Sequence, residues 1–372
     1  MSTPRISSQS MMYTTDYWDP TFTESSEIFG PPRQLSVVRN HGAQTAIGTI
    51  AYDAGPLASI MVNSSTVGST YDVQIANQQH VEGMHIPSHR PTYSYQQVQN
   101  IPTTPRRRND VFNQYLNLVR SRFAGQHTQW SPQYYMKETL IALATFGYGN
   151  AAVQSDPESA KIFEDFQEVL RRMLPPSLGF QELQIRVPEI ILRTSTGEFS
   201  IDAISGGVAA VIELAWQIFM FQPSGAQFVV TIDEPENHLH PELQRRVLAD
   251  LLAAFPDVQF VVATHSPFIV GSVPDSYVHV LRYDGTRKVY SHLLDTVNRA
   301  GTANEVLREV LGLQATIPVW VESRLEAIVD KYAERSFDSQ TLDELRVEME
   351  QSGLENQITR TIAEIASRKD VQ

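Results

Sequence analysis

The sequence contains no cysteine, and only five of its 372 residues are lysines. The absence of cysteine excludes disulfides, thiolate zinc sites, iron–sulfur clusters and cysteine nucleophiles. Long hydrophobic runs are missing too, since the longest, residues 208–221, is interrupted by Glu213 and Gln217 and is too short to cross a bilayer. The first 15 residues are polar and lack the features of a signal peptide. We therefore expect a cytoplasmic protein without a membrane segment.

Basic charge is scarce overall and concentrated in one stretch. The chain has 42 acidic and 29 basic residues, a net charge of −13, which argues against a surface that coats nucleic acid through charge alone. Residues 90–122 are the exception, because six arginines there face a single acid, Asp110. The triplet Arg106-Arg107-Arg108 in this stretch predicts either a nucleic-acid contact or solvated side chains that open a helix.

The changing pattern of apolar residues divides the chain into five predicted segments. Short β-branched runs between residues 34 and 76 indicate an antiparallel meander. Apolar residues at helical spacing follow, and Asp156-Pro157 is a strong helix start signal. The predicted segments are a flexible leader (1–33), an antiparallel β-subdomain and loop (34–108), a helical insertion (109–176), a core (177–300) and an acidic helical tail (301–372).

Strand and helix patterns alternate within the predicted core. Strands are predicted at residues 181–187, 190–194, 227–232 and 258–263, and helices at 207–221 and 241–255. Such alternation is typical of parallel strands joined by crossover helices, in a sheet that helices cover on both faces. The sequence therefore predicts an α/β fold with a mostly parallel sheet.

Two acids follow the apolar strand at 227–232 directly. The strand would deliver Asp233 to the carboxyl edge of the sheet, where a carboxylate can hold Mg²⁺ through water, and Glu234 could activate water. Neighbouring side chains on a strand point to opposite faces, so both acids serve one ligand only if the chain turns after Asp233. Pro235 is expected to supply that turn. The alternative is that both acids merely cap the helix beginning at Pro241.

Two further sequence elements, the Ser205-Gly206-Gly207 turn and His265, could also bind an anion. Ser205 is expected to cap the helix at 207–221, while Gly206 and Gly207 let an anion approach its free backbone N–H groups. Alone, this turn also fits a tight structural connection. His265 follows the strand at 258–263, so its imidazole should lie at the same sheet edge as Asp233, where it could bind a phosphate or orient water.

These elements together resemble the core of an ATPase of the ATP-binding-cassette (ABC) type across residues 198–268. Ser205-Gly206-Gly207 resembles the signature motif, residues 229–234 resemble the Walker B motif, and His265 resembles the switch histidine. Residues 238–241, His-Leu-His-Pro, are similar to those of the AAA-family ATPases grouped with the SMC, RecF and overcoming-lysogenization-defect proteins. The resemblance implies a P-loop NTPase-like fold.

The resemblance also implies roles for the individual residues. Asp233 would order Mg²⁺, Glu234 would polarise the attacking water and His265 would contact the γ-phosphate of ATP. Ser205-Gly206-Gly207 would reach a nucleotide held by a second subunit, so a homodimer or a hetero-partner across the nucleotide is expected.

A loop at residues 85–91 resembles a recurring loop of these ATPases. Within it, Arg90 is expected to bind the nucleotide, and the arginines of the neighbouring triplet are a second candidate for that contact.

One motif of the family is missing. A phosphate loop (Walker A) needs Gly-Lys-Ser or Gly-Lys-Thr, and none of the five lysines follows a glycine. Three explanations stay open: a shortened member, an ATPase completed by another chain, or a relic that keeps the fold. We predict Mg²⁺-dependent ATP hydrolysis by a member that is shortened or needs another chain. The alternative is a catalytically inactive module for protein–protein or protein–nucleic-acid interaction.

Overall fold

The computed structural model separates the chain into two compact units, residues 1–300 and 301–372. It describes residues 6–13, 44–52, 55–63, 73–88, 95–104, 106–123, 125–221, 223, 227–283, 285, 289–294, 303–307, 318–333, 335–336 and 338–370. Arg90, predicted to bind nucleotide, lies outside these residues, as do residues 35–39 at the start of the predicted meander.

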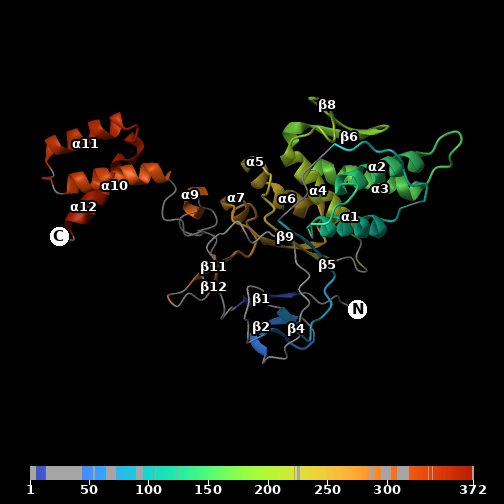
Figure 1. The fold of residues 1–372 in the computed structure, drawn as a ribbon, viewed down its shortest axis with the longest axis horizontal. Helices are drawn as coiled ribbons and strands as arrows, with labels where there is room; N and C mark the ends of the chain where they lie inside the picture. The colour runs from blue at the N-terminus through green and yellow to red at the C-terminus, as the bar shows by residue number, and fades with distance from the viewer. Residues whose placement is uncertain are drawn as a thin grey trace. The chain divides into compact units, whose positions relative to one another are not determined.

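A three-stranded parallel sheet forms the centre of the first unit (Figure 1). Its middle strand is β9 (Phe228–Asp233), which pairs in parallel with β10 (Val258–Ala263) on one side and β5 (Gly83–Ile86) on the other. The predicted strands at 227–232 and 258–263 are confirmed, and so is the parallel sheet. β5 lies beyond the predicted meander at residues 34–76, in the part of the 34–108 segment predicted as a loop, and that prediction is wrong for these four residues.

Helices of the first unit pack around an apolar core. The central helix α4 (Gly206–Met220) is buried along most of its length, and its Trp216 meets Phe166 of α3 (Pro157–Met173) edge to face at 5.1 Å between ring centroids. The helix predicted at 241–255 is interrupted. The other helices among the described residues of this unit are α1 (Arg108–Phe123), α2 (Pro132–Tyr148), α5 (Pro241–Gln244), α6 (Val247–Ala254), α7 (Pro267–Val270) and the single turn η1 (Pro176–Leu178).

A second sheet is antiparallel throughout. It consists of β6 (Phe180–Arg186), β7 (Glu189–Thr194) and β8 (Gly197–Ser200), in that order. The sequence predicted β6 and β7 as strands but grouped them with the parallel core. They form a hairpin instead, because the short connection between them leaves no room for a crossover helix.

A third sheet confirms the predicted antiparallel meander and adds one strand to it. Its order is β1 (Ile6–Tyr13), β2 (Gln44–Tyr52), β3 (Ala58–Asn63) and β4 (Val73–Ala76), all antiparallel. β1 falls in the stretch predicted as a flexible leader, so that prediction is wrong for residues 6–13. A hairpin of β11 (His279–Tyr283) and β12 (Val289–Leu293) was not predicted either.

The second unit is helical. It contains α10 (Val319–Ala333), α11 (Ser339–Gln351), the turn η3 (Glu355–Gln357) and α12 (Ile358–Asp370), whose buried residues form a core of their own. The short α9 (Ala303–Glu305) precedes them. Among the described helices of either unit, none is both long and apolar enough to span a membrane.

The contact between Phe166 and Trp216 generates a stability prediction. Both side chains are fully buried, so Phe166→Ala leaves a cavity and should cost about 3–5 kcal/mol of unfolding free energy. Urea denaturation followed by tryptophan fluorescence measures the loss. Tyr277→Ala, at a side chain 73% exposed, should change stability by less than about 0.5 kcal/mol. Equal losses in the two variants would contradict this packing.

Candidate functional site

The register of β9 with β10 determines which side chains meet at the carboxyl edge of the parallel sheet. Ala263 lies directly opposite Asp233, and neighbouring strands are about 5 Å apart. Thr264 and His265 follow Ala263 at once, so His265 leaves the sheet next to the two acids. Asp233 and Glu234 are half-buried, whereas His265 is exposed. We call this edge, with Asp233, Glu234 and His265, the carboxyl rim.

Glu234 makes the turn that was expected from Pro235. Its φ of 47° lies in the left-handed region, which costs a non-glycine residue on the order of 1–2 kcal/mol. Its backbone N–H donates to the carbonyl of Ala263 at 2.8 Å, which ties the turn to β10. The left-handed residue ends the alternation of the strand immediately after Asp233, which is what the shared use of both acids requires.

Asn237 orients the Glu234 carboxylate. Its Nδ2 donates to Glu234 Oε2 at 2.9 Å and to the carbonyl of Ser88, just after β5, at 3.1 Å. The amide therefore connects the ends of two strands. Sequence reasoning missed Asn237, although it stands three residues beyond Glu234 in the same loop.

Glu236 fixes the loop that carries His265. Its Oε1 accepts from the hydroxyl of Thr264 at 2.6 Å and from the backbone N–H groups of His265 and Ser266 at 3.0 and 3.1 Å. A charged acceptor makes each of these bonds stronger than a neutral one would be. Sequence reasoning missed Glu236 as well, because its partners are about thirty residues away and no local pattern links them.

The Ser-Gly-Gly turn starts α4 as expected. Ser205 Oγ accepts from the N–H of Val208 at 3.4 Å, and Ser205 and Gly206 are both exposed. A Cβ on Gly206 would meet open space, whereas a Cβ on Gly207 would lie 3.3 Å from the carbonyl of His238. The N-terminus of α4 therefore packs against the loop that leaves the carboxyl rim, with one bare glycine facing outward.

A buried ion pair holds the turn that precedes Ser205. Lys137 of α2 pairs with Asp202, and its Nζ also donates to the carbonyl of Gln96 at 3.1 Å and lies 3.5 Å from Glu189 Oε2. Burial raises the pKa of Asp202, against the opposing effect of the Lys137 charge. The helical insertion thus positions the start of α4 through one charged contact.

The arginine triplet does not present a single basic surface. Arg106 lies 2.6 Å from Glu138, whose pKa is raised by burial despite that pairing. Arg108 stacks over Phe219 at 4.4 Å from the ring centroid, and only Arg107 is exposed. Two of the three guanidiniums are held within the protein, so only Arg107 of the triplet is exposed for the predicted nucleic-acid contact.

The carboxyl rim suits a magnesium ion that is shared with phosphate oxygens. No group of three or more His, Asp or Glu side chains among the described residues is close enough to hold a metal by itself. Mg²⁺ usually takes only one or two carboxylates and completes its octahedron with waters and phosphates. A single strand-end carboxylate, Asp233, has the oxygen chemistry that such a site requires.

Similarity to known proteins falls on the same part of the chain. Residues 99–271 match a family model described as AAA domain, putative AbiEii toxin, Type IV TA system. The Septu protein PtuA of Bacillus thuringiensis is 27% identical over 169 residues, 41% of this chain and 43% of that protein. The retron Vc95 probable ATPase of Vibrio cholerae serotype O1 biovar El Tor is 31% identical over 129 residues, 33% of this chain and 24% of that protein. The chain thus spans less than half the length of either relative.

Solved structures of SMC proteins give weaker likenesses. A structure from work on ATP-driven dimerization and DNA-stimulated activation of SMC ATPases is 21% identical, with a TM-score of 0.31, and covers 41% of this chain and 93% of that one. The SMC head domain from Thermotoga maritima is 19% identical, with a TM-score of 0.28, and covers 36% of this chain and 46% of that one.

The three bonds of Glu236 generate a prediction about the rim. Glu236→Ala removes the acceptor of the His265 N–H and of the Thr264 hydroxyl, while the Ser266 N–H keeps its bond to Thr264 Oγ1 at 2.9 Å, and the change should cost about 1–3 kcal/mol of unfolding free energy. Amide hydrogen exchange of residues 264–266 should become faster. Glu242→Ala, at an exposed side chain of α5, is the matched control and should leave this exchange unchanged. Unaltered exchange in Glu236→Ala would contradict its role.

Proposed function

We propose that this chain, whose residues 99–271 match an AAA-domain family model, is an ABC-type AAA ATPase and contributes the hydrolytic half of a composite ATP site. In this site Asp233, Glu234 and His265 act on the γ-phosphate of ATP, and the phosphate loop comes from outside the 372 residues. The observation that supports the proposal is the register of β9 with β10, in which Asp233 lies opposite Ala263, two residues before His265.

Each rim residue has a role that its position supports. Glu234, held by Asn237 Nδ2, accepts a hydrogen bond from the attacking water and polarises it. His265 reaches the γ-phosphate from a loop that Glu236 holds by its backbone. Asp233 would hold Mg²⁺, which supplies charge stabilisation to the phosphate oxygens when bound. Because phosphoryl transfer needs positioning above all, these fixed loops matter as much as the side chains they carry.

The start of α4 supports a nucleotide shared between two subunits. Its cap residue Ser205 and the neighbouring Gly206 are exposed, so the positive end of the helix is open to a phosphate carried by another molecule. We propose that ATP joins this surface to a second copy of the chain or to a different partner. Hydrolysis would then weaken the association.

The edge strand β10 supports a phosphate loop delivered by an added strand. Among the described residues β10 pairs only with β9, yet it is almost wholly apolar and its Val261 is 38% exposed. Apolar parallel strands are usually covered on both faces, and bare apolar edges are avoided. A parallel strand added to β10 would end at the carboxyl rim, where a strand, phosphate loop and helix deliver their backbone amides.

The second candidate function is an interaction module that does not turn over ATP. The observation in its favour is that no lysine of the sequence follows a glycine, so the chain by itself has no phosphate loop. The two functions differ in their response to nucleotide, which the following experiments measure.

Glu234→Gln tests hydrolysis. Phosphate release from Mg²⁺-ATP is measured for the chain alone and together with a chain that carries the phosphate loop. The variant should lose activity by about 100-fold or more, since the amide polarises water poorly. Glu242→Gln, at an exposed position on α5, should keep full activity. Equal rates in Glu234→Gln and the parent would point to a contaminating enzyme. No release under either condition would favour the inactive module.

Gly206→Trp tests the shared nucleotide. A side chain at Gly206 meets open space in this chain, so the melting temperature should not fall. The indole would, however, block a phosphate from approaching α4, so association induced by a non-hydrolysable ATP analogue should be lost. Sedimentation velocity measures it, and Glu158→Trp, at an exposed position on α3, is the control. Nucleotide-induced association that survives in Gly206→Trp would exclude this surface.

A further inference from the structure

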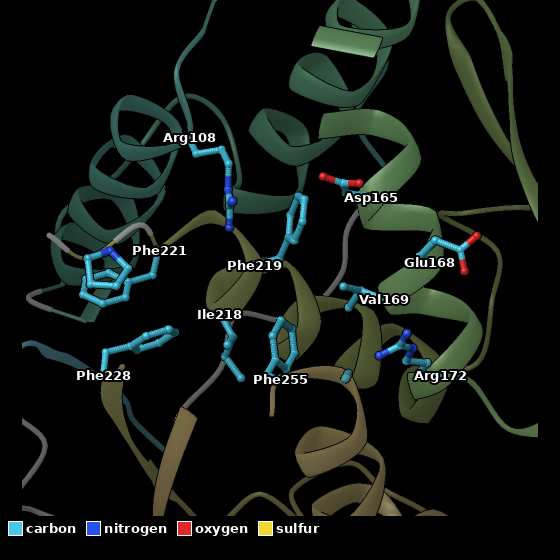
Figure 2. Close-up of a pocket in the computed structure, with 12 residues that line it drawn as sticks. Arg108, Asp165, Glu168, Val169, Arg172, Ile218, Phe219, Phe221, Phe228 and Phe255 are labelled. Atoms are coloured by element: carbon cyan, nitrogen blue, oxygen red, sulfur yellow. The ribbon is translucent and has the colours of Figure 1, made fainter. Parts of the chain in front are cut away.

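A cavity of about 500 Å³ lies at the opposite, amino edge of the parallel sheet (Figure 2). Phe228, the first residue of β9, is part of its wall, while Asp233 stands at the other end of the same strand. At a rise of about 3.3 Å per residue, the two positions are roughly 17 Å apart. The cavity is therefore separate from the carboxyl rim, and we call it the amino-edge cavity.

The side chain of Arg108 enters this cavity without a polar partner. Its guanidinium stacks on Phe219, and Nε is buried with no hydrogen bond. Within the described part of the chain, the side chain makes no ion pair or hydrogen bond at all. Burial lowers the pKa of Arg108, against the opposing effect of Asp165. A half-buried cation without an acceptor is costly, which makes this group a candidate for binding an anion.

The acids near the cavity already have cations of their own. Asp165 accepts from Lys161 of the same helix at 2.8 and 2.9 Å, and Glu168 pairs with Arg171. In Figure 2 the carboxylate of Glu168 also points away from the cavity. Arg172 enters from α3 as a second guanidinium and uses one nitrogen to donate to the carbonyl of Ala253 at 3.0 Å. The unmatched charge in the cavity is therefore positive.

Aromatic rings make up much of the remaining wall. The rings of Phe221 and Phe228 lie 5.0 Å apart between centroids, and Phe255 and Ile218 line the wall below Arg108 (Figure 2). Flat rings favour a flat ligand, which can stack on one ring or meet another edge to face. The volume is within the range of sites that hold small organic molecules.

We propose that the amino-edge cavity binds a small anionic aromatic molecule, whose carboxylate or phosphate lies on Arg108 and whose ring lies among Phe221, Phe228 and Phe255. The fork of a guanidinium matches two oxygens of either anion, so both are recognised by the same geometry. This site does not depend on the proposed ATPase function, because it uses none of the rim residues.

Titration calorimetry of the full chain without Mg²⁺ tests the proposal with four probes: indole-3-acetate, adenosine monophosphate, neutral indole and inorganic phosphate. At least one of the two aromatic anions should bind with one-to-one stoichiometry. Indole and inorganic phosphate should each bind at least ten-fold more weakly than that anion, because each offers only half of the required chemistry. The stronger of the two anions shows which of these aromatic anions the cavity prefers.

Arg108→Gln should lower the affinity for the anion at least ten-fold, while Arg107→Gln, at the exposed neighbour, should leave that affinity unchanged. Phe228→Leu removes one ring of the cavity wall and should also lower the affinity for the anion. It serves in place of Arg108→Gln if that variant does not fold. The proposal is overturned if neither aromatic anion gives saturable binding. It is equally overturned if affinity is the same in the parent and in whichever of these two variants folds.

Discussion

The parallel pairing of β9 with β10 is the constraint on which the carboxyl rim depends. Hydrogen bonds between the strands place Ala263 opposite Asp233. A slip by one residue would move every side chain of a strand to the other face, so the register also decides where His265 emerges. The apolar composition of both strands and the helices packed on them hold that register.

Polar contacts beyond the ends of the strands then hold the loops that carry the residues of the carboxyl rim. Glu234 adopts a left-handed backbone conformation, and the N–H bond to Ala263 together with the amide of Asn237 offsets the cost of that conformation. Glu236 gathers three donors from the neighbouring loop on one oxygen. The rim is therefore held by side chains that stand next to the acids in sequence and bind the loops of other strands.

The two edges of the same sheet have opposite chemistry. The carboxyl edge presents acids, a histidine and an exposed helix N-terminus, which suit a metal ion and phosphate. The amino edge presents phenylalanines and two guanidiniums that no acid of the cavity wall neutralises fully, which suits an anion with an apolar body. A third feature, the bare apolar edge of β10, gives the sheet a place where another strand could pair.

Local patterns were enough to predict much of this protein. Asp156 and Ser205 cap the helices they were expected to cap, and β10 runs from Val258 to Ala263 as predicted, because caps and apolar runs act within a few residues. The family followed from motifs that are short and contiguous for the same reason. Sequence alone also predicted that Asp233 and the strand before His265 end at one edge of the sheet, and the parallel pairing of β9 with β10 agrees with that.

Tertiary structure alone decided the features that depend on distant partners. β5 is four residues with no apolar run, and it becomes a strand because β9, more than 140 residues away, offers it hydrogen bonds. Glu236 holds the loop of His265 because backbone donors of that loop lie within hydrogen-bond distance of its carboxylate. Arg108 is half-buried because its guanidinium stacks on Phe219 of α4. Such contacts join segments that the chain brings together only on folding, so no pattern of neighbouring residues records them.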